Sequence, residues 1–406
     1  MAPKLYNHSS MTVTVRSFAK INLGLRIGAA RADGFHELLT VYQTIGLHDV
    51  IRVRVERGSG VEIRCEDPRV PRDESNTCYR MVSRAMAGLR AKGRAVIEIE
   101  KRLPVQGGLG GASANAVACL VGLERAVRKR LPAAERLRIA AEVGSDLPLF
   151  LIGGTVLGVG RGEQVYPLAD LPAMPCVVLT PEIGVSTPKA FAEWDRRVAR
   201  GLKPGSSGEA DATLKGRSST FESTKIGSSG TAAADLRSAG QPRAGVPTQE
   251  GDRQTRTDEC VRPNVGHAES GGGKLTVGDV SDRMNELSRG LSAWLSEPYS
   301  SAPSSFMAGR GRAGNPLLWL VRAGIENDFE QVVFPEYPEL CEGKRALERA
   351  GAKYASLSGS GSTLYGLFGS KRASARAVVS LRKHGWTAQA TWTLTRKAYW
   401  RRMMAG

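Results

Sequence analysis

A glycine-rich segment at residues 104–113, P-V-Q-G-G-L-G-G-A-S, is the strongest chemical pattern in this 406-residue sequence. Its glycines, Gly107, Gly108, Gly110 and Gly111, let the backbone adopt positive φ angles and approach an anion closely. Helical spacing follows at once, and the start of a helix supplies free N–H groups and a partial positive charge. The segment therefore predicts a phosphate-binding loop, although taken alone it is equally compatible with a structural turn.

Two familiar nucleotide-binding loops do not fit this segment. The sequence contains no G-x-x-x-x-G-K-[ST], since Gly273-Lys274 is followed by Leu275. A dinucleotide-binding fingerprint needs an acidic residue about twenty positions beyond its glycines. Glu124 arrives too early, inside the expected helix, so the loop is of a third kind.

A carboxylate and an ammonium group form the second candidate constellation. Asp146 lies in G-S-D-L-P-L-F at residues 144–150, where apolar neighbours would leave a lone carboxylate poorly solvated. Lys20 and Asn22 occupy alternate positions of an apolar strand and so face one way. A lysine in the interior of a strand needs a counter-charge, and Asp146 is the candidate. Alternatively, Asp146 only caps a helix or turn.

The elements that must position these residues mix α and β structure. Apolar alternation and β-branched residues predict strands at residues 12–27, 49–56, 95–100, 155–159, 176–179, 354–357 and 362–368. Helical spacing predicts helices from about residue 113 to before 132, and at 133–143, 284–295 and 342–350. The glycine-rich segment thus joins a strand to a helix.

Residues 201–281 differ in composition from the rest of the chain. Ser, Gly, Thr and Ala dominate there, and Phe221 is the only aromatic residue. Such a stretch buries too little surface to offset the entropy of ordering its backbone, about 1–2 kcal/mol per residue. We therefore expect a disordered insertion that projects from the surface.

The net charge indicates which classes of molecule the protein attracts. Lys and Arg exceed Asp and Glu by 57 to 40, a net charge of +17, which attracts nucleic acid, anionic membranes or phosphorylated small molecules. The aromatic interleaving of a single-strand nucleic-acid surface is absent. The six cysteines contain no C-x-x-C pair, which argues against a zinc site. Without a long apolar run or a signal pattern, we expect a cytoplasmic protein with no membrane contact.

Five motifs occur in the order found in the GHMP kinases. They are A-K-I-N-L-G-L at 19–25, R-A-D-G-F-H at 31–36, the glycine-rich segment, G-S-D-L-P-L-F at 144–150 and S-G-S-G-S-T at 358–363. Over residues 13–200 and 315–368 the chain resembles this superfamily. Within it, the similarity is greatest to members that phosphorylate a cytidine-diphosphate-linked methylerythritol in the non-mevalonate route to isoprenoid precursors.

The resemblance implies an α+β, two-domain GHMP kinase fold, with an N-terminal domain like domain 2 of ribosomal protein S5 and a ferredoxin-like C-terminal domain. We expect an ATP-binding domain at residues 11–175 and a substrate-binding domain at 176–200 and 282–396. The insertion occupies 201–281. Residues 397–406 are then a basic, solvated tail.

The resemblance also implies residue roles. Asp146 matches the general base of the family and Lys20 its partner. The expected ATP contacts are Asn76, Lys101, Pro104, Gly107, Gly108, Leu109, Gly110, Gly111 and Ser113. The expected substrate contacts are Asn22, Phe35, His36, Thr187 and Phe191, with Phe191 stacked on cytosine. Ser358, Gly359, Ser360 and Gly361 are expected to line the active site.

Three residues depart from the family pattern. Phe35 stands where a tyrosine is usual, Ala112 where a glycine is usual, and Ala114 where a serine is usual. The first removes a hydroxyl near the cytosine, and the others change how the loop meets phosphate or magnesium.

The expected reaction is ATP-dependent phosphorylation of the substrate 2-hydroxyl. ATP and Mg²⁺ are the expected cofactors, with no dedicated protein metal site, no nucleic-acid partner, and a monomer or weak homodimer. Two alternatives stay open. One is another GHMP kinase of the homoserine or mevalonate kinase type, and the other is a basic nucleic-acid-binding protein of related fold.

Overall fold

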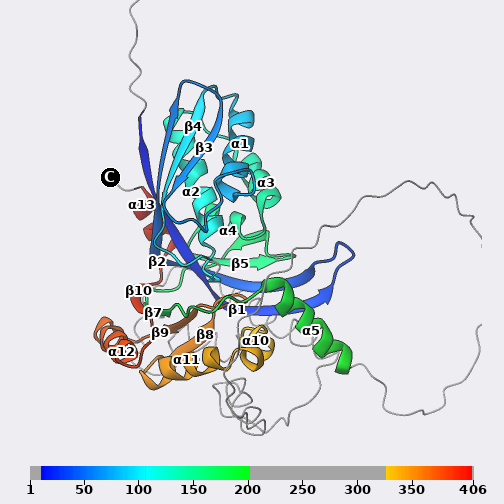
Figure 1. Ribbon diagram of the computed structural model, residues 1–406, viewed down its shortest axis with the longest axis vertical. Coiled ribbons are helices and arrows are strands. Elements are labelled where there is room, and N and C mark those ends of the chain that lie inside the picture. Colours follow the sequence, from blue (N-terminus) through cyan, green and yellow to red (C-terminus); the bar gives the residue numbers. More distant parts are fainter. Residues whose placement is uncertain (1–10, 106, 202–325, 405–406) are drawn as a thin grey trace, which may run out of the picture.

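The computed structural model describes residues 11–105, 107–201 and 326–404 (Figure 1). The expected insertion at 201–281, except its first residue, and the expected helix at 284–295 lie outside the described residues.

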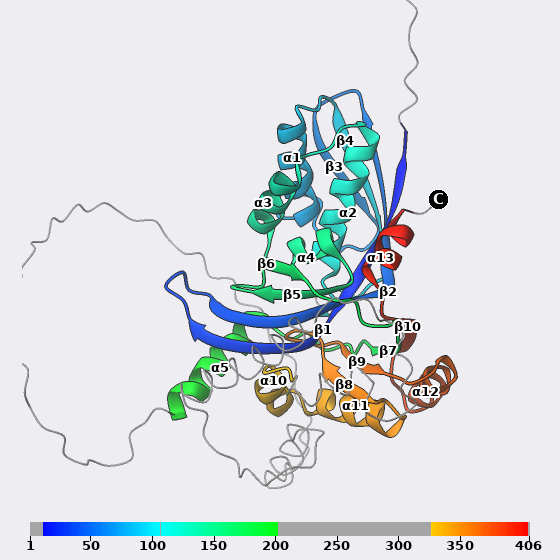
Figure 2. The same cartoon turned by 180° about the vertical axis from the view of Figure 1, so that it is seen from behind.

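A long hairpin connects the two halves of the structure. It consists of β1 (Val13–Ala30) and β2 (His36–Glu56), which pair antiparallel along their length. The register shifts between Phe18 and Lys20 and again between Asn22 and Gly24. Such irregularities bend a strand and re-aim its side chains. Lys20 and Asn22 therefore lie at the bend that these register shifts produce. The hairpin itself runs from one half of the structure into the other (Figures 1 and 2).

The N-terminal half is a six-stranded sheet packed against helices. Its strand order is β3-β4-β2-β5-β6, with β1 paired to β2. The further elements are β3 (Gly60–Cys65), β4 (Arg94–Glu100), β5 (Thr155–Val159), β6 (Gln164–Pro167), α1 (Thr77–Leu89), α2 (Gly111–Ala126), α3 (Ala133–Val143) and α4 (Leu147–Ile152). The glycine-rich segment leads from β4 into α2, as the sequence predicts.

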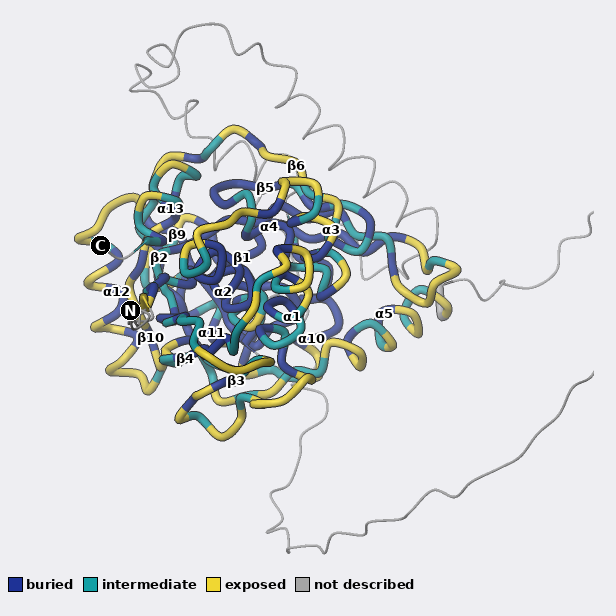
Figure 3. The backbone as a smooth tube through the Cα atoms, turned by 90° about the horizontal axis from the view of Figure 1, so that it is seen from above, coloured by how far each residue is buried: buried dark blue, intermediate teal, exposed yellow. Residues whose placement is uncertain are grey.

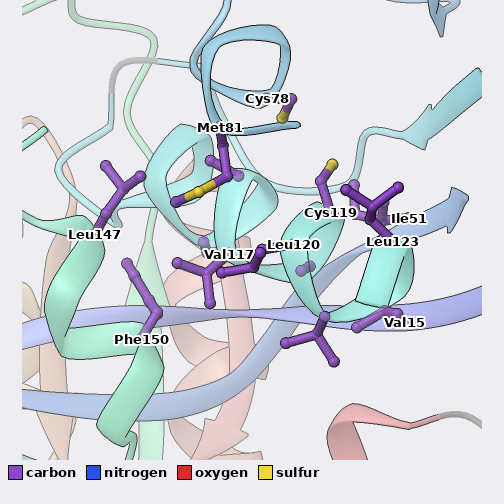
Figure 4. Close-up of a cluster of buried hydrophobic side chains, with 14 of the residues drawn as sticks. Val15, Ile51, Cys78, Met81, Val117, Cys119, Leu120, Leu123, Leu147 and Phe150 are labelled. Atoms are coloured by element: carbon purple, nitrogen blue, oxygen red, sulfur yellow. The ribbon is translucent and has the colours of Figure 1, made fainter. Parts of the chain in front are cut away.

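Helix α2 occupies the centre of this half. Every residue from 114 to 124 is buried, so the helix is covered on all sides rather than on one face. Figure 4 shows Val117 and Leu120 of α2 in the same cluster as Val15 of β1 and Phe150 of α4. Figure 3 shows that buried stretches gather around α2, whereas exposed residues lie toward the rim. The start of α2 is thereby held in a fixed position.

The C-terminal half is a four-stranded antiparallel sheet in the order β10-β7-β9-β8. Its elements are β7 (Pro175–Leu179), α5 (Thr187–Gly201), α10 (Glu330–Glu336), α11 (Pro338–Arg349), β8 (Tyr354–Leu357), β9 (Leu364–Leu367), α12 (Lys371–Lys383) and β10 (Ala388–Trp392). Side chains of β7 alternate: Val177 and Leu179 pack with the helices, whereas Cys176 and Val178 pack against the hairpin. Helices α11 and α12 pack on this sheet, and the succession β7, α11, β8, β9, α12, β10 together with the strand order confirms the ferredoxin-like expectation.

One helix and two short strands were predicted to the residue. The helix at 133–143 and the strands at 155–159 and 354–357 have the expected bounds. The strand expected at 49–56 is only the end of the 21-residue β2. Residues 39–45 of β2 are buried without alternation, so the period-two pattern that marks a half-exposed strand is missing there.

The expectation of a solvated tail at 397–406 is wrong for its described part. Residues there form α13 (Arg396–Met403), in which Tyr399 and Met403 are buried. The Tyr399 hydroxyl donates to the Phe150 carbonyl at 2.8 Å, and the indole N–H of Trp400 donates to the Ile152 carbonyl at 2.9 Å. The helix lies beside β1 (Figure 2). Although α13 is rich in basic residues, its apolar face packs into the N-terminal core.

No described helix combines the length and the apolar character needed to cross a membrane.

Replacement of Tyr399 by alanine tests whether α13 belongs to the core. Removal of this buried ring should lower the free energy of unfolding by about 3–5 kcal/mol, since a cavity is left at the α13–α4 contact. Urea denaturation measures this change. Lys397→Ala, an exposed position on the same helix, should alter stability by less than about 0.5 kcal/mol. Equal effects of the two substitutions would mean that α13 does not stabilise the domain.

Candidate active site

The predicted pair of opposite charges is present at the bend of the hairpin. Lys20 Nζ lies 3.5 Å from Asp146 Oδ2, and the two side chains are 4% and 34% exposed. Lys20 also donates a hydrogen bond to Asn22 Oδ1 at 2.7 Å. The ammonium group is thus buried among partners, whereas the carboxylate reaches the surface. This geometry leaves Asp146 accessible to a bound molecule.

The helix-capping alternative for Asp146 is not what the structure shows. Asp146 occupies the N-cap position of α4, but its side chain makes no capping hydrogen bond. Instead its Oδ1 accepts a hydrogen bond from the Tyr42 hydroxyl at 3.1 Å. The carboxylate therefore faces Lys20 and Tyr42 rather than its own helix.

Tyr42 is a site residue that the sequence did not indicate. It is 2% exposed, and Lys20 Nζ lies 5.5 Å from the centre of its ring. Burial and the neighbouring Asp146 charge raise the pKa of Tyr42 well above its usual range. Tyr42 is therefore a permanent hydrogen-bond donor to the carboxylate. It lies in the unpredicted part of β2, where no local pattern marked it.

The glycine-rich segment and the loop at 358–363 interlock. A Cβ atom on Gly108, whose φ is +75°, would lie 2.2 Å from the Ser358 carbonyl oxygen. The Ser358 hydroxyl donates to the Gly108 carbonyl at 3.0 Å, and the Thr363 N–H donates to the Gly107 carbonyl at 3.2 Å. Only glycine permits this approach. The expected lining loop thus holds the expected phosphate loop.

The same segment also contacts the charged pair. The Lys20 N–H donates to the Leu109 carbonyl at 3.0 Å. A Cβ atom on Gly110, at the N-cap of α2 with φ +68°, would lie 3.1 Å from Lys20 Cγ. A Cβ atom on Gly359 would lie 3.6 Å from Lys20 Nζ. The structure therefore brings the N-terminus of α2, Lys20 and the 358–361 loop to one place.

Two buried polar residues hydrogen-bond to the backbone in and just before the 358–361 loop. The Asn327 side-chain amide donates to the Leu357 and Gly359 carbonyls at 2.9 and 2.7 Å. Glu330 accepts from the Leu357 N–H at 2.9 Å. Thr187 at the start of α5 shares a 2.7 Å hydrogen bond with the Ser360 hydroxyl. Sequence reasoning missed Asn327 and Glu330, because nothing local distinguishes them from surface polar residues.

Lys101 lies beside the phosphate loop and has its own buried partner. Its Nζ is 2.7 Å from Asp49 Oδ2, and it would lie 3.5 Å from a Cβ atom on Gly111. Asp49 is wholly buried; it also accepts hydrogen bonds from the Leu103 N–H and the Asn115 side chain. Asp49 therefore joins β2, the end of β4 and α2, and it fixes the ammonium group near the start of the helix.

The remaining expected ATP contacts are Asn76, Pro104 and Ser113. Asn76 is the N-cap of α1; it accepts from the Cys78 N–H and donates to the Pro71 carbonyl. Its polar atoms thus serve the protein itself. Pro104 packs against Gly107, with Cγ 3.0 Å from a Cβ atom built there. Ser113 is half-buried in the first turn of α2. ATP contact by these residues stays a prediction.

The residues expected to meet a nucleobase gather where α5 approaches the start of β2. The rings of His36 and Phe191 stack with centroids 4.9 Å apart and planes 11° apart. His36 Nε2 lies 2.7 Å from Asp195 Oδ1. Phe35 is 49% exposed, and the Arg161 guanidinium lies 4.9 Å from its ring centre. Phe191 therefore stacks on His36 in this structure. A bound base would have to share the face of the Phe191 ring with the imidazole.

Within the described residues, no group of three or more His, Cys, Asp or Glu side chains is placed to hold a metal ion.

Comparison with known proteins agrees with this geometry. The family model for the GHMP kinases N terminal domain matches residues 76–154, and the GHMP kinases C terminal model matches residues 317–385. Two solved structures share the fold. A 4-(cytidine 5'-diphospho)-2C-methyl-D-erythritol kinase has a TM-score of 0.55 at 23% identity and covers 94% of this chain and 98% of its own. A mevalonate kinase has a TM-score of 0.52 at 10% identity, and the match covers 95% of this chain and 99% of that kinase.

Curated relatives extend the similarity to nearly the whole chain. A 4-diphosphocytidyl-2-C-methyl-D-erythritol kinase of Solibacter usitatus (strain Ellin6076) is 30% identical over 394 residues, which are 96% of this chain and 92% of that protein. The enzyme of that name from Rhodococcus jostii (strain RHA1) is 40% identical over 200 residues, 49% of this chain and 64% of its own length. The chain therefore belongs to the GHMP kinase family, among the relatives of 4-diphosphocytidyl-2-C-methyl-D-erythritol kinase.

Proposed function

We propose that the protein transfers the γ-phosphate of ATP to the 2-hydroxyl of 4-diphosphocytidyl-2-C-methyl-D-erythritol, giving the 2-phosphate and ADP. The observation that carries this proposal is the Lys20–Asp146 pair beside the glycine-rich N-terminus of α2. The names of the curated relatives support the choice of substrate. The reaction belongs to the non-mevalonate route to isoprenoid precursors.

Asp146 accepts the proton of the substrate hydroxyl in this mechanism. As the alcohol oxygen forms its bond to the γ-phosphorus, the bond from that phosphorus to the β–γ bridging oxygen breaks and ADP leaves. The exposed carboxylate is suited to receive the proton. Lys20 offsets the negative charge that gathers around the attacking oxygen. Tyr42 holds Asp146 Oδ1, which leaves Oδ2 near Lys20.

The N-terminus of α2 supplies the phosphate site. Its free N–H groups and the positive end of the helix dipole favour an anion at Gly110 and Gly111. Magnesium bound to the ATP phosphates would add charge neutralisation, and it commonly takes few protein ligands. The hydroxyl of Ser113, in the first turn of α2, is the side-chain oxygen that would hold such an ion.

The stacked His36 and Phe191 rings favour a substrate that contains a pyrimidine over homoserine and mevalonate, the substrates of the two alternative kinases. Because the two planes differ by only 11°, a base that hydrogen-bonds to His36 in the imidazole plane stays parallel to Phe191. Homoserine and mevalonate carry no ring that could use this arrangement. A nucleic-acid-binding protein would need neither this stack nor the Lys20–Asp146 pair. The cytoplasmic location and the monomeric or weakly dimeric state stay predictions from sequence.

Asp146→Asn tests the general base. The amide keeps the shape of the side chain but cannot accept the proton, so kcat should fall by at least about 100-fold while ATP still binds. Coupled ADP release with the cytidine substrate, homoserine and mevalonate measures turnover, and ATP titration measures binding. Turnover of the Asn variant at the wild-type rate would refute the base assignment. Wild-type turnover with homoserine or mevalonate alone, or RNA affinity without turnover, would refute the substrate assignment.

Tyr42→Phe tests whether its hydroxyl positions the base. Loss of one hydrogen bond to a carboxylate should lower kcat by about tenfold, with little change in the KM for ATP. Tyr399→Phe is a matched control, since its hydroxyl is equally buried and bonds only to a backbone carbonyl. That control should keep the wild-type kcat. An unchanged kcat in Tyr42→Phe would show that Lys20 alone orients Asp146.

Phe191→Ala tests the stacking surface. Removal of the ring should raise the KM for the cytidine substrate by about 5- to 100-fold, the range expected for loss of one base–aromatic stack. The KM for ATP should stay within about twofold, because the phosphate loop is not involved. Steady-state kinetics with each substrate varied in turn separates the two values. An unchanged KM for the cytidine substrate would contradict the stacking role.

A further inference from the structure

We propose that Asp195 makes the site selective for cytosine over uracil by fixing the tautomer of His36. The inference rests on the proposed function and names the residue that sets its base preference. Asp195 does so without touching the base, through the imidazole of His36.

Helix α5 presents two groups to His36 from one face. Phe191 and Asp195 are four residues apart, so their side chains are neighbours on the helix surface. Phe191 lies against the imidazole plane, with centroids 4.9 Å apart. Asp195 meets the edge of that ring, with Oδ1 2.7 Å from Nε2. The helix therefore sets both the plane of the imidazole and the hydrogen bond at one of its nitrogens.

The carboxylate decides which nitrogen carries the hydrogen. A neutral imidazole has one N–H donor and one acceptor nitrogen, whereas an ionised carboxylate only accepts. The short contact therefore requires the hydrogen on His36 Nε2. In the neutral ring Nδ1 is then a hydrogen-bond acceptor, since the partner of one ring nitrogen determines the role of the other.

An acceptor at Nδ1 distinguishes the two pyrimidines. Cytosine carries an amino group at C4, which donates, whereas uracil carries a carbonyl oxygen there, which accepts. Nδ1 can pair with the amino group in the plane parallel to Phe191. With uracil held in the same position as cytosine, two lone pairs would face each other, and a site that leaves buried polar atoms unpaired rejects the wrong ligand strongly. Selectivity then depends on the proton position in His36.

The fold does not require the contact between Asp195 and His36. His36 is 8% exposed but Asp195 is 54% exposed, so the carboxylate could remain in water without cost. A second carboxylate on the same helix behaves differently: Glu193 pairs with Arg196, three residues on, at 2.7 Å. Asp195 instead reaches across to a residue of β2. Glu193→Ala therefore serves as the matched control.

The experiment compares the wild-type chain with Asp195→Ala, Asp195→Asn and Glu193→Ala. Calorimetric titration with CDP and UDP at pH 8.5, above the titration range of an ordinary imidazole, gives the base preference without turnover. We expect wild-type protein to bind CDP at least about tenfold more tightly than UDP. Asp195→Ala should reduce that ratio to about threefold or less, mainly through weaker CDP binding. Asp195→Asn, which keeps an acceptor oxygen, and Glu193→Ala should retain the ratio.

A spectroscopic measurement tests the tautomer directly. The chain has five histidines, so ¹⁵N-histidine labelling with a His36→Gln difference spectrum assigns the His36 ring nitrogens. The wild-type spectrum should show hydrogen on Nε2 and none on Nδ1, and Asp195→Ala should show a mixture. A wild-type ring with hydrogen on Nδ1, or an Asp195→Ala variant that keeps the full CDP preference, would overturn the inference.

The outcomes also separate this inference from the proposed function. If the proposed function is wrong, the wild-type protein transfers no phosphate to the cytidine substrate. If only the inference is wrong, that turnover is present and Asp195→Ala discriminates CDP from UDP as the wild type does.

Discussion

Burial of one ammonium group is the constraint on which the site depends. The Lys20 side chain is 4% exposed, and a charge removed from water must find partners to replace its hydration. Its partners are Asn22 on the same strand, Asp146 at the start of α4 and the ring face of Tyr42 on β2. The requirement to satisfy one charge therefore holds three separated parts of the chain together. The same arrangement leaves the Asp146 carboxylate at the surface, where a substrate can meet it.

Close backbone approach is the second organising feature. Two glycine-rich segments, one from each half of the molecule, fit together at Gly108 and Ser358 with no room for a side chain. The two segments hydrogen-bond to each other; in addition, the Lys20 N–H holds the first segment at Leu109, and the Asn327 amide holds the second at Gly359. The proposed phosphate site is thus built jointly by the two halves of the structure, which is possible because the β1–β2 hairpin runs through both.

Three residues that we propose to act on a bound molecule are each positioned by a partner that need not touch that molecule. Tyr42 holds Asp146, Asp49 holds Lys101 and Asp195 holds His36. In each pair a fixed partner restricts one side chain to a single orientation. Such preorganisation reduces the reorganisation needed when a substrate binds. A phosphoryl transfer that depends on alignment and charge placement is well served by this design.

The sequence by itself determined the chemistry and much of the local structure. The order of five motifs indicated the family, the buried-charge argument predicted the Lys20–Asp146 pair, and periodic segments such as 133–143 were predicted to the residue. Local patterns succeed there because they record which face of an element is buried, or which backbone angles a glycine allows.

Only the tertiary structure decided the supporting partners and the position of the C-terminal helix. Tyr42 and Asp146 are 104 positions apart, and His36 and Asp195 are 159 apart. Whether such groups meet depends on how sheets and helices pack, and no local pattern records that. The basic character of α13 likewise hid two residues that the N-terminal core buries. Local periodicity reports burial on one element, whereas hydrogen bonds between distant elements arise only when the whole core has assembled.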